Sequence, residues 1–128
     1  MTPELTKLSW VLVLHAVCWV PYILNRVMVQ GITEAVGYPE NPKPLSPWAE
    51  RARKAHYNSV ENLVAFAAIV LLLNAVSISN DTTVLACTVY FWARLVHYVV
   101  YVAAVPWLRT LSYAAGWLST LALIWQAL

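Results

Sequence analysis

Charged residues are scarce in this sequence. Only 11% of its 128 residues are charged and 61% are hydrophobic, whereas a typical soluble domain has about 25% charged and about 45–50% apolar residues. A soluble protein of this length has a large surface for its volume and needs more charge to cover it. The composition therefore excludes a soluble globular domain and predicts an integral membrane protein with one domain, residues 1–128.

Several other features are missing, and each absence removes a class of function. The net charge is only +2 and no basic run resembles a nucleic-acid-binding arm, which argues against nucleic-acid binding. Cys18 and Cys87 lie far apart in apolar stretches, so buried free thiols are favoured over a disulfide. The sequence has no glycine-rich phosphate loop and no nucleophile elbow, and His15, His56 and His97 lack metal-ligand spacing.

Apolar segments take up most of the chain. A membrane-spanning helix needs about 20 mainly apolar residues, and four segments meet that length: Leu8–Val29, Ser59–Ser77, Thr83–Val105 and Leu108–Leu128. They predict an all-α integral membrane protein built as a four-transmembrane-helix bundle. We expect the second helix to extend into the cytoplasm from about residue 48, and Pro21 to kink the first helix.

The connections between these segments differ in charge. Most Lys and Arg residues flank the first connection, namely Arg26, Lys43, Arg51, Arg53 and Lys54, and the third connection carries Arg109. The second connection carries Asp81 and no basic residue. The positive-inside rule therefore predicts that the first and third connections face the cytoplasm and that both termini face outward.

Each predicted span keeps its polar residues on one face at the helical step of about 100°. These faces predict a polar, cationic pocket near the cytoplasmic interface, lined by Arg26, Lys54, Arg94 and Arg109, with Glu61 as the one deep acidic residue. Such a pocket suits a ligand with several carboxylates and one ammonium group. The same residues allow a structural alternative, an Arg94–Glu61 ion pair inside the bundle.

Three motifs carry a family resemblance. Residues 50–61 (ERARKAHYNSVE), 91–101 (FWARLVHYVVY) and 106–113 (PWLRTLSY) resemble the signatures of the MAPEG family, the membrane-associated proteins of eicosanoid and glutathione metabolism. The chain looks like a bacterial member on the microsomal glutathione transferase and prostaglandin E synthase side. We therefore expect it in the bacterial inner membrane, with its site toward the cytoplasm.

The resemblance implies a homotrimer with a glutathione site between neighbouring subunits and an apolar second substrate from the lipid. Arg109 resembles the arginine that stabilises the glutathione thiolate, and Thr110 and Tyr113 fall beside it in the catalytic set. The positions that match glutathione contacts are Arg26, Lys54, Asn58, Glu61, Arg94, His97 and Tyr101. The implied activity is conjugation of glutathione to apolar electrophiles or reduction of lipid hydroperoxides.

The sequence also departs from the family pattern. Lys54 stands where many relatives carry arginine, Tyr57 replaces an arginine of the prostaglandin synthases, and Thr110 replaces a serine. Glu34 is the candidate for an acidic residue near the first loop. Two other functions stay open at this stage: a small proton-coupled transporter that uses Glu61, and a non-catalytic scaffold with the family fold.

Overall fold

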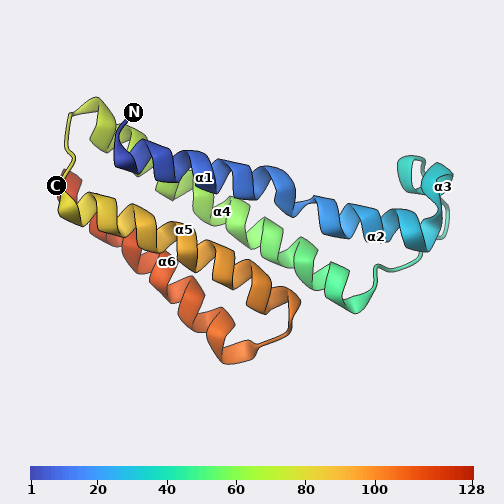
Figure 1. Ribbon diagram of the computed structural model, residues 1–128. Helices are drawn as coiled ribbons and strands as arrows, with labels where there is room; N and C mark the ends of the chain where they lie inside the picture. Colours follow the sequence, from blue (N-terminus) through green and yellow to red (C-terminus); the bar gives the residue numbers. More distant parts are fainter.

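The computed structural model describes residues 1–128 and is built of helices without strands. Four long rods lie side by side, and the first of them consists of two helices in line (Figure 1). In chain order the helices are α1 (Pro3–Cys18), α2 (Val20–Gln30), α3 (Ile32–Val36), α4 (Pro47–Ala75), α5 (Asp81–Val102) and α6 (Pro106–Ala127).

The first rod begins earlier than the apolar pattern indicates and breaks near its middle. Thr2 caps α1 by accepting a hydrogen bond from the Leu5 amide at 3.3 Å, so the polar first turn is already helical. The break falls at Trp19, two residues before Pro21. Because proline has no amide hydrogen, Pro21 cannot donate to the preceding turn. The break agrees with the expected kink.

The second rod, α4, is the longest helix at 29 residues. It starts at Pro47, which suits a first helical position because that amide has no partner inside the helix. Its neighbour Ser46 is held by Asn25 of α2: the Ser46 amide donates to Asn25 Oδ1, and Asn25 Nδ2 donates to Ser46 Oγ, each at 2.9 Å. This pair fixes where the long connection after α3 ends and α4 begins.

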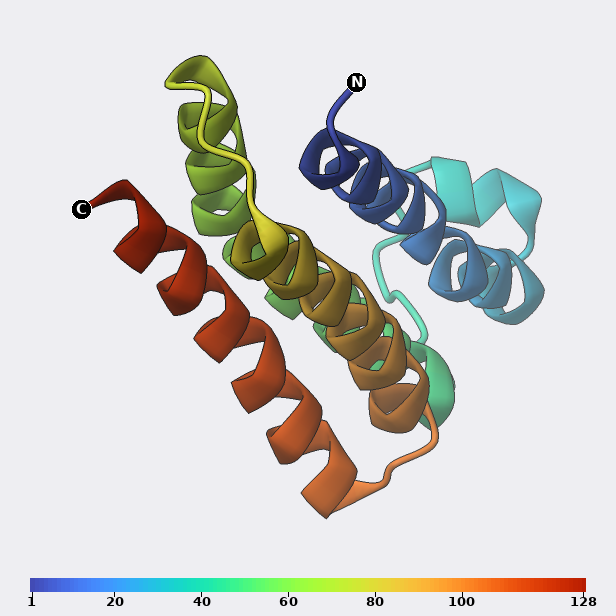
Figure 2. The same ribbon diagram turned by 60° about the vertical axis from the view of Figure 1, so that its left-hand side comes forward.

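The last two rods form an antiparallel pair (Figure 2). An Asn80–Thr83 capping box starts α5. Ala104, with φ of 61°, lies in the tight turn between the pair, and Pro106 opens α6. Each helix has 22 residues, or about 33 Å, which matches a hydrocarbon core of about 30 Å.

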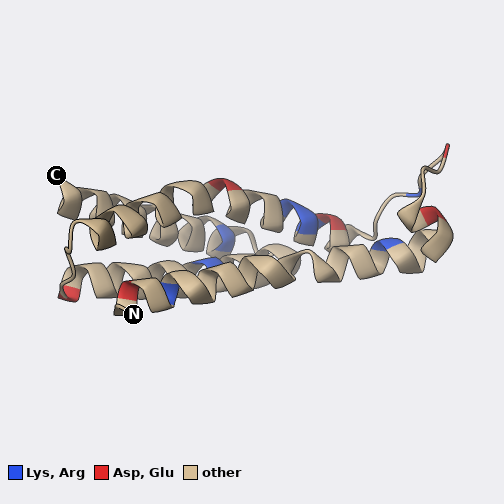
Figure 3. Ribbon diagram, turned by 90° about the horizontal axis from the view of Figure 1, so that it is seen from above, with Lys and Arg blue, Asp and Glu red and all other residues tan.

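Three helical segments are long and apolar enough to cross a membrane: Pro3–Gln30, Pro47–Ala75 and Asp81–Val102. Charged residues are sparse along them (Figure 3). The fourth rod, α6, is as long as α5 but is not among these segments. The fold is thus an all-helical membrane protein, and the fourth span stays a prediction.

The core lies where α1, α4, α5 and α6 meet. Phe66 of α4 and Tyr90 of α5 stack with ring centroids 3.6 Å apart and planes 1° apart. The other buried members of this cluster are Leu8, Val11, Ile69, Val70, Leu73, Ala86, Cys87 and Leu123. Many large apolar side chains, such as Val64 and Leu118, are exposed, as expected of a surface that faces lipid or another subunit.

Candidate functional site

One cavity gathers polar side chains from three helices. Its volume is about 300 Å³, and it is lined by Asn58 of α4, His97 and Tyr101 of α5, and Arg109, Thr110 and Tyr113 of α6. All six are among the site residues singled out from the sequence. The cavity contains the three proposed catalytic residues and three of the seven proposed glutathione contacts.

Helical spacing and the α5–α6 turn explain why these side chains converge. His97 and Tyr101 are four residues apart on α5, and Arg109 and Tyr113 are four apart on α6, so each pair shares a helix face. Because α5 and α6 are antiparallel and joined by a short turn, the end of one lies beside the start of the other. Asn58 of α4 completes the wall.

Arg109 brings an available positive charge to the cavity. Its side chain is exposed, and its guanidinium carbon lies 5.1 Å from the centroid of the Tyr101 ring, a distance at which the ring face attracts a cation. The one ion pair in the chain is Arg53–Glu50, which lies on α4. The fork of Arg109 is therefore free to meet an anionic ligand.

Arg94 lies behind the cavity wall. It is 1% exposed, and its Nη2 donates to Asn58 Oδ1 at 2.7 Å and to Ser59 Oγ at 2.8 Å. Arg94 does not line the cavity, but it contacts two residues that do: Asn58 and, with Nη2 3.4 Å from Nδ1, His97. The Arg94–Glu61 ion pair that the sequence left open is not formed, because Glu61 lies on the exposed face of α4.

Besides Arg94, three expected ligand residues lie outside the cavity of this chain. Lys54 and Glu61 are exposed on α4, and Arg26 is partly exposed on α2. None of them lines the cavity. Asn58 lies between these two residues on one face of α4, four residues after Lys54 and three residues before Glu61. The two side chains therefore flank the α4 side of the cavity wall.

Two residues that are not among the expected site residues, Ser59 and Arg51, hold this region together. Ser59 is 2% exposed and accepts a hydrogen bond from Arg94; its position next to Asn58 was the available signal. Arg51 Nε donates to the Val102 carbonyl oxygen at 2.9 Å and so ties α4 to the last turn of α5. The spacing of neighbouring residues in the sequence does not predict this hydrogen bond, because its two residues are 51 positions apart.

The other histidines and both cysteines lie outside the cavity. His15 is 8% exposed and its Nδ1 lies 2.8 Å from the Val11 carbonyl oxygen, as expected of a packed histidine. His56 Nδ1 pairs with the Tyr22 hydroxyl at 2.9 Å. Cys18 and Cys87 are both free and buried, and no group of three or more potential metal-binding side chains is present.

The cavity chemistry suits a polar anion. One guanidinium, one imidazole, two phenols, an amide and a hydroxyl converge on it, and all six can donate a hydrogen bond. The Thr110 hydroxyl has one long bond, at 3.4 Å to the Pro106 carbonyl oxygen, so a ligand can compete for it. The fold and the site define a helical membrane protein with a polar cavity near one end of its bundle, and one arginine lines that cavity.

Comparison with known proteins narrows this class to a family. The model of the MAPEG family matches residues 9–128, and the chain belongs to that family. It is 32% identical over 80 residues to microsomal glutathione S-transferase 1 of Homo sapiens and, to the same extent, to that of Bos taurus. Each alignment covers 62% of this chain and 52% of the relative, so the chain spans about half the length of the curated relatives it matches. No solved structure matches it.

Proposed function

We propose that this protein is a glutathione-dependent membrane enzyme that activates the glutathione thiol, either for conjugation to apolar electrophiles or for reduction of lipid hydroperoxides. The observation that carries the proposal is the cavity in which the unpaired Arg109 meets Thr110, Tyr113, His97, Tyr101 and Asn58. Family membership and the names of the matched relatives support glutathione as the polar substrate.

Arg109 has the central role in this proposal. A free thiol has a pKa of about 8.5 and is only a few per cent ionised at neutral pH. A guanidinium a few ångströms away lowers such a pKa by about 1–3 units, which makes the thiolate a large or dominant fraction. Arg109 holds the thiolate, and the Thr110 hydroxyl donates a hydrogen bond to the sulfur. Tyr113, one turn further along α6, lines the same wall.

The other cavity residues hold the body of the substrate. Asn58 carries both a donor and an acceptor, although its Oδ1 already accepts from Arg94. Its Nδ2 therefore remains to donate to a carboxylate. His97 and Tyr101 lie on the α5 side with ring centroids 5.5 Å apart. In this arrangement Arg94 is a positioning residue that keeps Asn58 directed at the cavity.

A homotrimer accounts for the three residues outside the cavity. Arg26, Lys54 and Glu61 are exposed or partly exposed in the single chain, so they are available to a site shared between subunits. Arg26 and Lys54 then contribute cations for the two carboxylates of glutathione, and Glu61 contributes an acceptor for its ammonium group. Buried Arg94 donates to Asn58 and Ser59 through Nη2, and in this proposal it supports the glutathione site by holding Asn58.

The membrane setting fits an apolar second substrate. Grooves between α5 and α6 are lined mainly by apolar side chains, including Val89 and Ala115, which are common to two of them. An apolar electrophile or lipid hydroperoxide reaches such a surface by partitioning into the bilayer. We further propose one MAPEG domain over residues 1–128, in a bacterial inner membrane, with the termini outside and the cavity toward the cytoplasm.

The test is glutathione binding to the purified protein in nanodiscs, measured by calorimetry together with the ultraviolet absorbance of the thiolate. The wild type should bind glutathione and show a thiolate signal whose midpoint lies about 1–3 pH units below that of free glutathione. Arg109→Ala should move the midpoint back toward about 8.5 and lower turnover by at least about 100-fold. Arg53→Ala is the matched control, because Arg53 is paired with Glu50 and does not line the cavity.

Three outcomes separate the alternatives. Equal turnover in Arg109→Ala and wild type would remove Arg109 from the mechanism. Glutathione binding without turnover of any electrophile or peroxide would indicate the non-catalytic scaffold. Absence of binding at millimolar glutathione would overturn the proposal as a whole. Native mass spectrometry of the same samples tests the trimer separately, since a monomeric mass would contradict the shared site.

A further inference from the structure

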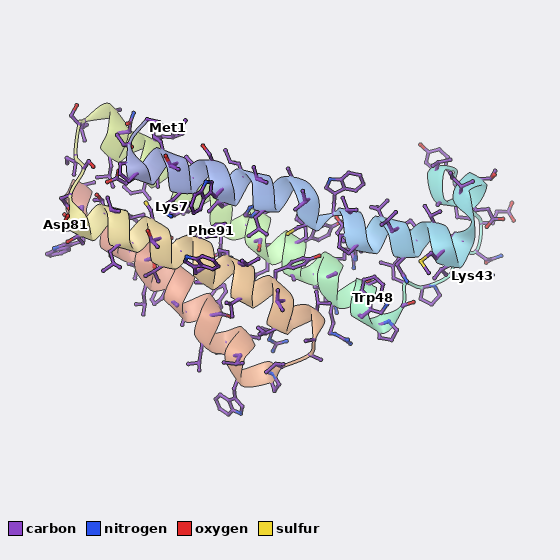
Figure 4. The ribbon with its side chains drawn as sticks, in the orientation of Figure 1. Met1, Lys7, Lys43, Trp48, Asp81 and Phe91 are labelled. Carbon is purple, nitrogen blue, oxygen red and sulfur yellow. The ribbon has the colours of Figure 1, made fainter.

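A second cavity lies at the other end of the helical rods. Its volume is about 210 Å³, and it forms where α1 and α5 begin and α4 ends. In Figure 4 the labelled Met1 and Asp81 mark this end, far from Lys43 and Trp48. The lining residues are Thr2, Glu4, Val70, Leu73, Asn74, Ser77, Ile78, Ser79 and Cys87. None of them belongs to the cavity described above.

Glu4 is the unusual member of this lining. It is only 4% exposed. One of its carboxylate oxygens, Oε1, accepts hydrogen bonds from Ser79 Oγ at 2.8 Å and from Thr83 Oγ1. The other oxygen, Oε2, is buried and has no hydrogen-bond partner. A buried carboxylate with one unpaired oxygen thus belongs to the lining of this cavity.

No positive side chain of the protein neutralises this carboxylate. The one ion pair in the chain joins Arg53 to Glu50. Lys7, one turn beyond Glu4 on α1, instead has its Nζ 3.7 Å from the centroid of the Trp10 ring. The N-terminal ends of α1 and α5 supply partial positive charge. They leave Oε2 without a direct partner, although buried carboxylates are normally paired and hydrogen-bonded.

We propose that this cavity binds one small monovalent cation, an alkali ion or a primary ammonium group, with the Glu4 carboxylate as its charged ligand. One carboxylate balances one positive charge. Thr2, Asn74 and Ser77, whose side chains carry hydroxyl or amide oxygens, line the cavity beside it, and hard cations take such oxygen ligands. With a liquid-water volume of about 30 Å³ per molecule, the space holds an alkali ion with several waters or an ammonium group with its first carbon.

The chemistry of the lining excludes other metals. No cluster of three His, Cys, Asp or Glu side chains is present, and Cys87 is the single soft ligand on the wall. Zinc and other transition metals need several nitrogen or sulfur ligands. Calcium is normally held by six to eight oxygen ligands, several of them carboxylates. One carboxylate among neutral oxygens favours a single charge.

The primary experiment measures binding of radioactive sodium ions to the full chain in phosphatidylcholine nanodiscs, which contain no primary amine. We expect saturable binding of one ion per chain, displaced by methylammonium but not by tetramethylammonium, whose methyl groups block hydrogen bonding. Repeating the titration in nanodiscs rich in phosphatidylethanolamine shows whether the cation comes from solution or from the ammonium group of a lipid. Weaker sodium binding there indicates that the lipid headgroup occupies the site, and unchanged binding indicates an ion from solution.

Substitutions assign the binding to this cavity. Glu4→Gln keeps an oxygen for Ser79 and Thr83 but removes the charge, and it should weaken sodium binding at least tenfold. Asn74→Leu removes a polar lining residue and leaves the Glu4 hydrogen bonds in place, because their donors are Ser79 and Thr83. Asn74 is exposed, and its replacement should weaken binding several-fold. Asp81→Asn removes an exposed carboxylate at the same end, outside the cavity, and should change binding less than twofold.

Two results would overturn the proposal. One is the absence of saturable sodium or methylammonium binding to the wild type, as expected if Oε2 carries a proton. The other is equal binding by wild type, Glu4→Gln and Asn74→Leu, which would place the cation elsewhere. Because the two cavities share no residue, either result leaves the glutathione proposal standing.

Discussion

Arg94 Nη2 donates to Asn58 Oδ1 across 2.7 Å, and of these two residues only Asn58 borders the candidate glutathione cavity. The bond joins α5 to α4 and directs the Asn58 amide. Arg94 therefore connects the packing of the helices to the shape of the cavity. A change that displaces Arg94 should alter both the stability of the protein and its affinity for the polar substrate.

Gly116 offers a direct test of that connection. A Cβ at Gly116 of α6 would lie 3.3 Å from Arg94 Cδ. In Gly116→Ala the higher helix propensity of alanine stabilises the protein by about 1 kcal/mol, and the close contact with Arg94 opposes this gain. The free energy of unfolding should therefore stay within about 1 kcal/mol of wild type. Gly116→Leu overfills the contact and should lose about 1–3 kcal/mol, with weaker glutathione binding. Unfolding in detergent and calorimetry measure the two effects. Equal stability and affinity of the Leu and Ala variants would show that Arg94 is not held in place.

The Phe66–Tyr90 stack predicts opposite effects for two aromatic substitutions. Both side chains are fully buried, and the Tyr90 hydroxyl has no hydrogen-bond partner. Tyr90→Phe keeps the stacked rings and removes an unsatisfied group, so it should be neutral or stabilising by about 1–3 kcal/mol. Phe66→Ala leaves a cavity and should cost about 3–5 kcal/mol. Unfolding of the two variants side by side checks this. A destabilised Tyr90→Phe would indicate that the hydroxyl has a partner in the membrane-embedded protein.

Asn25 controls the connection between α3 and α4. Its side chain is 4% exposed and makes two hydrogen bonds to Ser46, each at 2.9 Å. Asn25→Ala removes both, at about 1 kcal/mol each, and hydrogen exchange of residues 31–46 should become at least about tenfold faster. Gln30→Ala is the matched control, because its single bond to the Lys43 carbonyl oxygen is long, at 3.4 Å. Similar exchange rates in the two variants would count against Asn25 as the anchor.

The sequence predicts the helical membrane fold because membrane spans need long apolar runs and because Pro21 and Pro106 mark breaks directly. Helical periodicity also places Asn58, His97, Tyr101, Arg109 and Tyr113 on the polar faces of their helices, whereas Thr110 is assigned through the family resemblance. Periodicity does not tell how far a side chain lies from the cavity. Arg94 shares its helix face with His97, yet it is buried behind Asn58.

Other features depend on contacts between distant parts of the chain. Glu4 and Thr83 are 79 residues apart, and nothing local in the sequence shows that Glu4 is buried against the start of α5. Lys54 and Glu61 lie on the predicted face of α4 but do not line the cavity of a single chain. Local periodicity fixes the face of a helix, whereas burial and partners depend on how the helices pack together.

The buried state of both native thiols also makes the protein suitable for site-directed labelling. Cys18 and Cys87 are 3% and 0% exposed, so reagents that modify accessible cysteines should leave the folded chain unlabelled. A cysteine introduced at an exposed position such as Glu40 or Thr82 would then be the sole reactive handle, without prior removal of the native ones. Pairs of spin labels or fluorophores at such positions would report changes in helix spacing during turnover in an otherwise unaltered bundle.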